Sequence, residues 1–185
     1  MDEITIRASR LEDAGPIARL DVETWRATYA GILETRYLVG LSPERRAIGW
    51  ANVIRREPRD VRVAVAGDEI VGFGSCGTCR GEPGFTSEVF TLYVATDWQN
   101  RGVGRRLLLA MFARLVSEGH ASAVIWVLRE NPARFFYQRL GGKEVRRKLL
   151  PFNGAQIAAS GYGWRDLPRF LSTIAGADRE SGPSS

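Results

Sequence analysis

The fold of this chain is decided by residues 88–108, which read EVFTLYVATDWQNRGVGRRLL. Residues 89–94 have the apolar and aromatic composition of a strand, and residues 103–115 keep the apolar spacing of a helix. Between them, Gly102 and Gly104 allow the backbone to approach a ligand closely. The unpaired N–H groups and the positive dipole end at the start of a helix can hold a phosphate. The stretch predicts a strand, a loop and a helix, and it leaves phosphate binding and a structural turn as equal interpretations of the loop.

Hydrophobic periodicity on either side of this unit predicts the other helices and strands. Upstream, it predicts a strand at residues 4–7, a helix from Ser9 to about Tyr29, a helix after Ser42-Pro43, and a hairpin of residues 61–65 and 70–75. Downstream, it predicts a strand at residues 123–127, a short helix from Pro132 to Gly141-Gly142, and extended stretches near residues 144–150 and 157–164. This order predicts an α/β fold with a mixed central sheet of about seven strands flanked by about four helices.

Length and composition favour a globular protein with one domain. The chain has 185 residues, of which 44% are hydrophobic and 25% are charged. Its longest apolar run, residues 107–113, is too short to cross a bilayer as a helix, and its start lacks the pattern of a signal peptide. We therefore expect a soluble cytoplasmic protein with a single domain over residues 1–170 and a flexible tail over residues 171–185.

The charge of the chain is basic and unevenly distributed. The formal net charge is +5, and eleven Lys or Arg residues stand against three Glu between Arg101 and Lys148. This excess leaves nucleic acid, anionic surfaces and anionic small molecules open as partners. Because the arginines largely accompany the glycine-containing loop and helix faces, we expect an anionic small molecule, no nucleic acid and no membrane. Steep salt dependence of DNA binding would indicate the nucleic-acid alternative.

The cysteine and histidine content argues against a metal site. Cys76 and Cys79 form a C-x-x-C pair, which is compatible with zinc or redox chemistry. A structural zinc needs about four ligands, however, and the single histidine, His120, lies far away in sequence. We interpret the cysteines as ordinary thiols flanking a turn at Gly77-Thr78, and His120 as a solvated residue after a helix. The sequence therefore predicts no metal and no histidine-based catalysis.

Two short motifs occur together in this chain. Residues 99–105 read QNRGVGR, and residues 131–137 read NPARFFY and are followed by Leu140-Gly141-Gly142. In this order they resemble the GNAT superfamily of N-acetyltransferases, and the resemblance covers most of residues 4–164. Gly142 departs from the family pattern, in which an aromatic residue is usual at this position. The resemblance implies a GNAT-type sheet and transfer of an acetyl group from acetyl-CoA to an amine.

The resemblance also implies where acetyl-CoA binds. Main-chain amides of the first motif would cradle its pyrophosphate, the backbone at the end of the preceding strand would pair with the pantetheine arm, and an asparagine of the second motif would contact the cofactor. These residues are Gln99, Asn100, Arg101, Gly102, Val103, Gly104 and Arg105, then Leu92 and Val94, and finally Asn131. The basic charge of this part of the chain agrees with a polyanionic ligand. We expect acetyl-CoA as co-substrate and no metal.

Acetyl transfer to an amine requires an acid and a base. Tyr137 stands at the family's tyrosine acid position, where it would protonate the leaving thiolate. Glu88 resembles the glutamate that many members use as base, usually through water. The alternatives are core packing with Phe135 and Phe136 for Tyr137, and an exposed strand-end carboxylate for Glu88.

The resemblance further implies that the first two helices and the connection between them line the acceptor side. It points to Trp25, Tyr29 and residues 31–41, for which core packing of the two aromatic residues is the alternative. We expect a small primary amine that attacks acetyl-CoA directly in a ternary complex. A protein N-terminus or lysine as acceptor, and a non-catalytic regulatory module that binds acetyl-CoA, are the other functions left open. The sequence also leaves a homodimer open.

Overall fold

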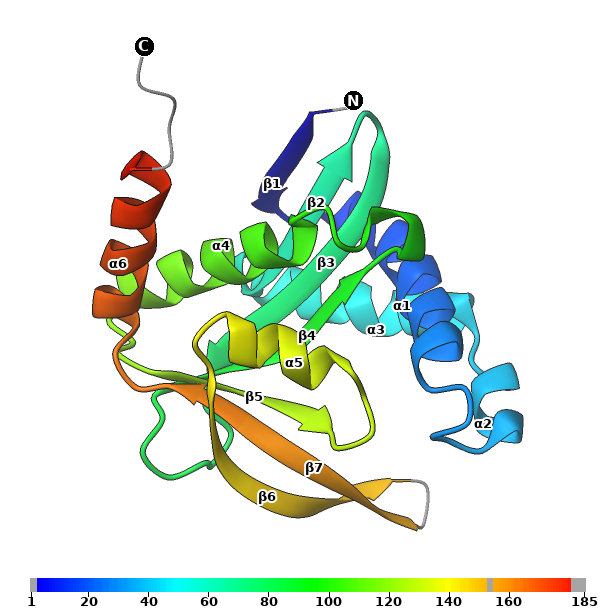
Figure 1. The fold of residues 1–185 in the computed structure, drawn as a ribbon. Helices are drawn as coiled ribbons and strands as arrows, with labels where there is room; N and C mark the ends of the chain where they lie inside the picture. The colour runs from blue at the N-terminus through cyan, green and yellow to red at the C-terminus, as the bar shows by residue number, and fades with distance from the viewer. Residues whose placement is uncertain (1–2, 153–154, 181–185) are drawn as a thin grey trace. The chain divides into compact units, whose positions relative to one another are not determined.

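The strands of the computed structural model, which describes residues 3–152 and 155–180, form a mixed sheet (Figure 1). They are β1 (Ile4–Ala8), β2 (Val61–Ala66), β3 (Glu69–Thr78), β4 (Ser87–Val94), β5 (Ala123–Leu128), β6 (Lys143–Phe152) and β7 (Ala155–Trp164). Their order is β1-β2-β3-β4-β5-β7-β6. The predicted α/β class and the mixed sheet of seven strands are confirmed.

Six α-helices lie within the described part of the chain, where the sequence predicts about four. They are α1 (Ala14–Thr28), α2 (Thr35–Val39), α3 (Pro43–Arg56), α4 (Val103–Ser117), α5 (Ala133–Arg139) and α6 (Leu167–Glu180). The short α2 and the C-terminal α6 are the two that the sequence does not predict. None of the described helices is both long and apolar enough to span a membrane.

Helix α6 corrects the expected C-terminal tail. A flexible tail is expected over residues 171–185, but residues 171–180 belong to α6, and residues 181–185 lie outside the described part. The helix is anchored because Leu167 is fully buried and the ring of Phe170 packs edge-on against Phe112 of α4, 5.9 Å between centroids. Tertiary contacts of its first turn therefore order a segment whose composition is typical of a solvated tail.

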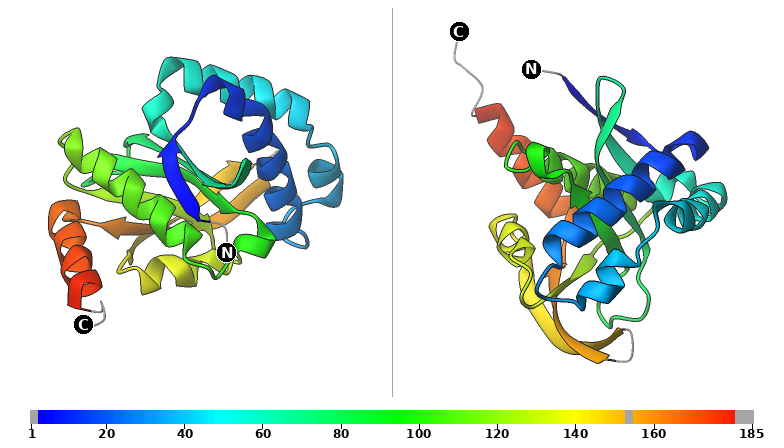
Figure 2. Two further views of the ribbon diagram at one scale, coloured as in Figure 1. Left: turned by 90° about the horizontal axis from the view of Figure 1, so that it is seen from above. Right: turned by 90° about the vertical axis from the view of Figure 1, so that its right-hand side faces the viewer.

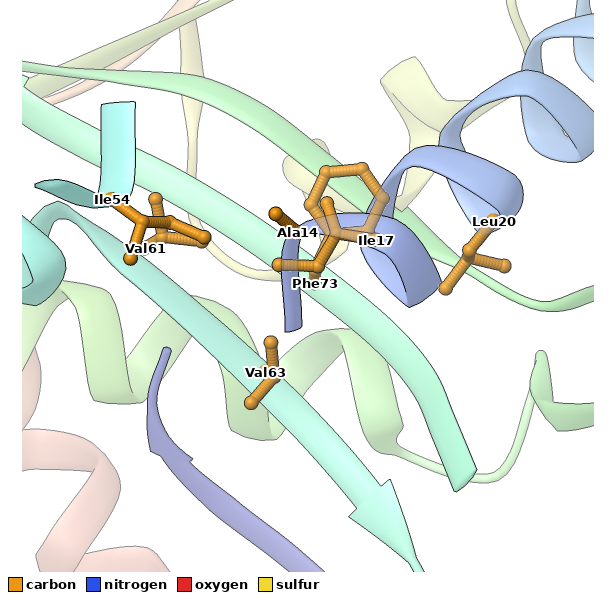
Figure 3. Packing of buried hydrophobic residues seen from close by; sticks show 7 residues of the cluster. All are labelled: Ala14, Ile17, Leu20, Ile54, Val61, Val63 and Phe73. Carbon is orange, nitrogen blue, oxygen red and sulfur yellow. The ribbon is translucent and has the colours of Figure 1, made fainter. Parts of the chain in front are cut away.

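The described residues group into two compact units, and the first consists of residues 3–76 and 89–111. Side chains of β2 alternate between two hydrophobic clusters in this unit. Val61 and Val63 join α1, α3 and Phe73 on one face (Figure 3). Ala64 and Ala66 join Val103 and Leu107 of α4 on the other. The strand-loop-helix unit predicted from residues 88–108 therefore ends in a helix that is anchored by burial. The members of the first cluster are Ala14, Ile17, Leu20, Ile54, Val61, Val63 and Phe73.

The second unit consists of residues 77–88 and 112–180. Its strands β6 and β7 run side by side as an antiparallel pair (Figure 2). Strand β5 pairs with the other edge of β7. Tyr162 and Trp164 of β7 are buried, and the Trp164 ring packs against Phe112 at 4.9 Å and Phe170 at 6.3 Å between centroids. These aromatic contacts build the core of the unit.

Gly142, which departs from the family pattern, lies directly against Trp164. An ideal Cβ on Gly142 would stand 2.8 Å from Cζ2 of Trp164 and 2.9 Å from the carbonyl oxygen of Tyr137. The Trp164 indole is held there because its Nε1 donates a hydrogen bond to the carbonyl oxygen of Leu140 at 2.9 Å. An aromatic ring therefore fills this space, but it comes from β7 and not from position 142.

Replacing Gly142 with alanine is expected to lower the free energy of unfolding by about 1–3 kcal/mol, because the added methyl group overpacks the core. Gly49→Ala is the matched control, since Gly49 lies in α3 with no heavy atom within 4 Å of an ideal Cβ. The control should instead stabilise the protein by about 0.5–1 kcal/mol. Urea unfolding of both variants measures the difference, and an unchanged stability for Gly142→Ala would contradict this account of the Trp164 contact.

The connection between β3 and β4 differs from the predicted turn. Gly77 and Thr78 continue β3, so the turn expected between the two cysteines is absent. Cys79 begins the connecting loop, where its N–H donates to the carbonyl oxygen of Thr86 at 3.1 Å and its thiol accepts from the N–H of Glu82 at 3.4 Å. Within residues 3–152 and 155–180, no three His, Cys, Asp or Glu side chains gather in a group able to hold a metal ion.

Candidate functional site

The loop that precedes α4 has an unusual backbone. A 3-10 turn at Thr96–Trp98 follows β4, and the helix begins at Val103. Asn100 and Gly102 have φ angles of 59° and 78°, and Asn100 is the one non-glycine residue with positive φ among the described residues. Left-handed residues of this kind form the concave backbone arrangements that bind anions. The local geometry favours a binding loop over a plain connection.

This loop is open to a ligand at its glycine. No heavy atom lies within 4 Å of an ideal Cβ on Gly102, and Asn100 and Arg101 are exposed. The N–H of Arg106 donates to the carbonyl oxygen of Gly102 at 3.0 Å, so Gly102 stands at the N-terminal end of the hydrogen-bond ladder of α4. Together with the helix dipole, this arrangement fits a phosphate or pyrophosphate.

Side chains of the same segment fix the loop onto β4. Gln99 donates from Nε2 to the carbonyl oxygen of Val94 at 3.1 Å, and the Arg101 guanidinium stacks over the Trp98 ring at 5.2 Å. Leu92 and Val94 are half-buried and pack against the cluster that includes α4. The first unit thus brings the predicted pyrophosphate loop and the predicted pantetheine strand into one continuous surface segment.

Trp25 and Tyr29 lie in an aromatic cluster, also in the first unit. Their ring centroids are 4.7 Å apart, and Tyr37 of α2 lies 6.2 Å from Trp25. Tyr29 is buried, Trp25 is half-buried, and the Arg46 guanidinium covers the Trp25 ring at 5.0 Å. The structure therefore joins both predicted acceptor residues, together with a tyrosine and an arginine that the sequence does not single out.

Arg46 is held in place by a buried carboxylate of α1. Oδ2 of Asp21 accepts from Nη1 of Arg46 at 3.1 Å and from Nε1 of Trp50 at 3.1 Å. Burial raises the pKa of Asp21, while the charge of Arg46 and the Trp50 hydrogen bond oppose this effect. Asp21 and Trp25 are spaced i and i+4 and so share one face of α1, but this spacing does not indicate Arg46 as their partner.

Asn131 and Tyr137 belong to the second unit. Asn131 is buried, and its Oδ1 accepts from the N–H of Ala133, the first residue of α5, at 2.9 Å. Tyr137 is buried on α5, 5.2 Å from the Phe136 ring and 6.3 Å from the ring of Tyr162. Burial, reinforced by the charge of Glu144, raises the pKa of Tyr162, a second buried tyrosine that sequence reasoning misses.

Glu88 is buried at the start of β4 and lies in the second unit. This placement corrects the alternative of an exposed strand-end carboxylate. Its Oε1 accepts from Nη2 of Arg80 at 2.7 Å, and its Oε2 accepts from the backbone N–H and Nε of Arg80, each at 3.2 Å. Arg80 is a further residue that the sequence does not indicate, because the contact depends on how the β3–β4 loop folds back.

Comparison with known proteins gives the family. The acetyltransferase (GNAT) family model matches residues 21–142. The uncharacterised N-acetyltransferase YuaI of Bacillus subtilis is 32% identical over 169 residues, covering 89% of this chain and 94% of that protein. The spermidine N(1)-acetyltransferase of Thermoplasma acidophilum is 25% identical over 146 residues, covering 76% of this chain and 88% of that protein. The structure of yncA from Salmonella typhimurium with its cofactor acetyl-CoA has a TM-score of 0.67 at 21% identity. The match covers 89% of this chain and 94% of yncA.

These matches agree with the two sequence motifs and with the order of the strands. The family model spans both the loop before α4 and the helix that carries Tyr137, and the likeness to YuaI extends over nearly the whole of both chains. Because the yncA structure is only 21% identical in sequence, its likeness supports the fold alone. The chain therefore belongs to the acetyltransferase (GNAT) family of acetyl-CoA-dependent N-acetyltransferases.

Proposed function

We propose that this enzyme acetylates a primary amine of a small molecule, by direct attack of the amine on acetyl-CoA in a ternary complex. The observation that carries the proposal is the open, left-handed loop at Gly102, which offers backbone donors at the start of α4. A relative that covers three quarters of this chain is a spermidine N(1)-acetyltransferase, which supports a small amine as acceptor.

Acetyl-CoA would be held by the backbone from Gln99 to Arg105 and by the strand end at Leu92 and Val94, with Asn131 as a further contact. Arg101 is exposed on this loop, and its positive charge would attract the pyrophosphate. When bound, acetyl-CoA supplies the thioester carbonyl that the amine attacks, so that a C–N bond forms and the C–S bond breaks. The loop contributes binding energy and orientation to this reaction.

Two side chains of the second unit would move the protons. Tyr137 donates its phenolic proton to the departing thiolate, and Glu88 receives the proton of the attacking amine through a water molecule. A carboxylate suits the role of base because it accepts a proton from the attacking amine. A tyrosine suits the role of acid because its phenol is of suitable acid strength to protonate a thiolate. Support for these roles comes from family membership and from the burial of both side chains.

The experiment that tests the function is a screen for CoA thiol release with acetyl-CoA and a library of amines. We expect release with one or more small primary amines, including polyamines, and the acetylated product in mass spectra. Acetyl-CoA binding without thiol release for any amine would favour a regulatory module. Labelling of protein bands in a lysate by radioactive acetyl-CoA, without turnover of small amines, would favour a protein acceptor.

Trp25→Ala is expected to raise the KM of the amine roughly tenfold, because a half-buried aromatic wall of the proposed acceptor side is lost. The KM of acetyl-CoA should stay unchanged, since the residue lies outside the loop that would hold CoA. Steady-state kinetics with each substrate varied in turn measures both constants. Equal changes in the two KM values, or loss of the folded state, would assign Trp25 to the core instead.

A further inference from the structure

The carboxylate of Glu88 is bound by a single residue of the β3–β4 loop. Arg80 supplies three donors, its backbone N–H, Nε and Nη2, at 3.2, 3.2 and 2.7 Å. The Glu88 side chain is 8% exposed, whereas the Arg80 side chain is 66% exposed. The loop therefore brings a cation from the solvent side onto a buried carboxylate, and the pairing removes the penalty of leaving that charge alone.

This arrangement fixes the orientation of Glu88 and leaves part of it available. Two guanidinium donors in one plane match the two carboxylate oxygens, and the backbone N–H adds a third constraint. Oε2 accepts two N–H groups, but Oε1 accepts only one from the described residues. Because a carboxylate oxygen has two lone pairs, Oε1 can still accept a hydrogen bond from water.

The loop that carries Arg80 is itself held by contacts within the second unit. Thr86 donates its backbone N–H to Oγ of Ser122 at 3.0 Å, and buried Phe85 lies over Gly163, where an ideal Cβ would stand 2.4 Å from the ring. An ion pair of 3.4 Å joins Glu82 of the loop to Arg146 of β6. The loop therefore holds Arg80 in a fixed position, as is required if Arg80 is to orient the Glu88 carboxylate.

We infer that Arg80 is a positioning residue for acetyl transfer, which holds the Glu88 carboxylate in the orientation in which Oε1 receives the amine proton through water. This inference rests on the proposed role of Glu88 as base. The ion pair is distinct from the acetyl-CoA loop, so its loss should affect the catalytic step and leave acetyl-CoA binding intact. A merely structural ion pair would affect stability alone.

The test is a double-mutant cycle on the full chain with Arg80→Met, Arg80→Lys and Glu88→Gln. Arg80→Met is expected to lower kcat about tenfold with the KM of acetyl-CoA unchanged, because the base is no longer held in place. Arg80→Lys, which keeps the charge and the backbone donor, should recover a large part of this loss. In the Glu88→Gln background, Arg80→Met should cause no further loss, since there is no base left to position.

Arg147→Met is the matched control, because it removes another arginine–glutamate ion pair of the same unit, the one with Glu144, without touching Glu88 or the β3–β4 loop. Its kcat should equal that of the unchanged enzyme, and thermal unfolding of all variants shows that they fold. The inference is overturned if Arg80→Met keeps full kcat while Glu88→Gln loses it, or if the two losses multiply in the double variant. Full activity in Glu88→Gln overturns both the base role and the inference, whereas absence of amine-dependent thiol release in the unchanged enzyme overturns the proposed function itself.

Discussion

Replacing Gly102 with valine is expected to abolish acetyl-CoA binding in a protein that still folds. Gly102 has a φ of 78°, a conformation that costs an L-residue about 1–2 kcal/mol and is especially poor for a β-branched one. No atom blocks the new side chain, which would extend into the open space beside the first amides of α4. The valine would therefore both distort the loop and occupy the space proposed for the pyrophosphate.

Titration calorimetry with acetyl-CoA measures this effect, and we expect affinity to fall by at least about 100-fold, equivalent to ~2.7 kcal/mol. Gly67→Val is the matched control, because Gly67 has a φ of 57° and equally open surroundings in the turn between β2 and β3 of the same unit. The control should lose similar stability and keep its affinity. Unchanged affinity in folded Gly102→Val would show that acetyl-CoA does not use this loop.

Tyr137→Phe is expected to lower kcat by roughly 10²-fold, the usual size of a general acid contribution. Phenylalanine keeps the ring that packs against Phe136 at 5.2 Å and against Tyr162 at 6.3 Å, so the fold and acetyl-CoA binding should be retained. Only the hydroxyl that would protonate the thiolate is removed. Rates of thiol release at saturating acetyl-CoA and amine measure the change.

Tyr162→Phe is the control for this prediction, since it removes the hydroxyl of a second buried tyrosine in the same unit. Burial raises the pKa of Tyr162, which makes it a poorer acid, and no catalytic role is proposed for it. Its kcat should stay unchanged. Full activity of Tyr137→Phe across the pH range would show that solvent water, and not Tyr137, protonates the thiolate.

The strand, loop and helix of residues 88–108 are predictable because their signals are local. Alternation, helical spacing and glycine each act over a few residues, and the structure places β4, the left-handed Gly102 and α4 in that order. Helix α2 is too short, with five residues, for periodicity to reveal it. Helix α6 is missed because its order comes from burial of Leu167 and not from composition.

Partners of the candidate site residues are less predictable than the residues themselves. The contacts of Arg80 with Glu88 and of Arg46 with Trp25 bridge 8 and about 20 positions, and both depend on how loops and helices return to one another. No residue pattern specifies such a return. The residue types in the two motifs indicate the chemistry, whereas the contacts that orient them follow from tertiary packing.

The position of the Trp164 ring beside Gly142 makes substitutions at these two positions interdependent. A phenylalanine at 142, as the family pattern has it, could enter only if the residue at 164 became small at the same time, because both would claim one volume. Each single exchange would pass through a clash or a cavity, whereas the paired exchange would conserve aromatic volume. Positions 142 and 164 therefore form one packing unit, in which the neighbouring strand supplies the ring and position 142 has to stay small.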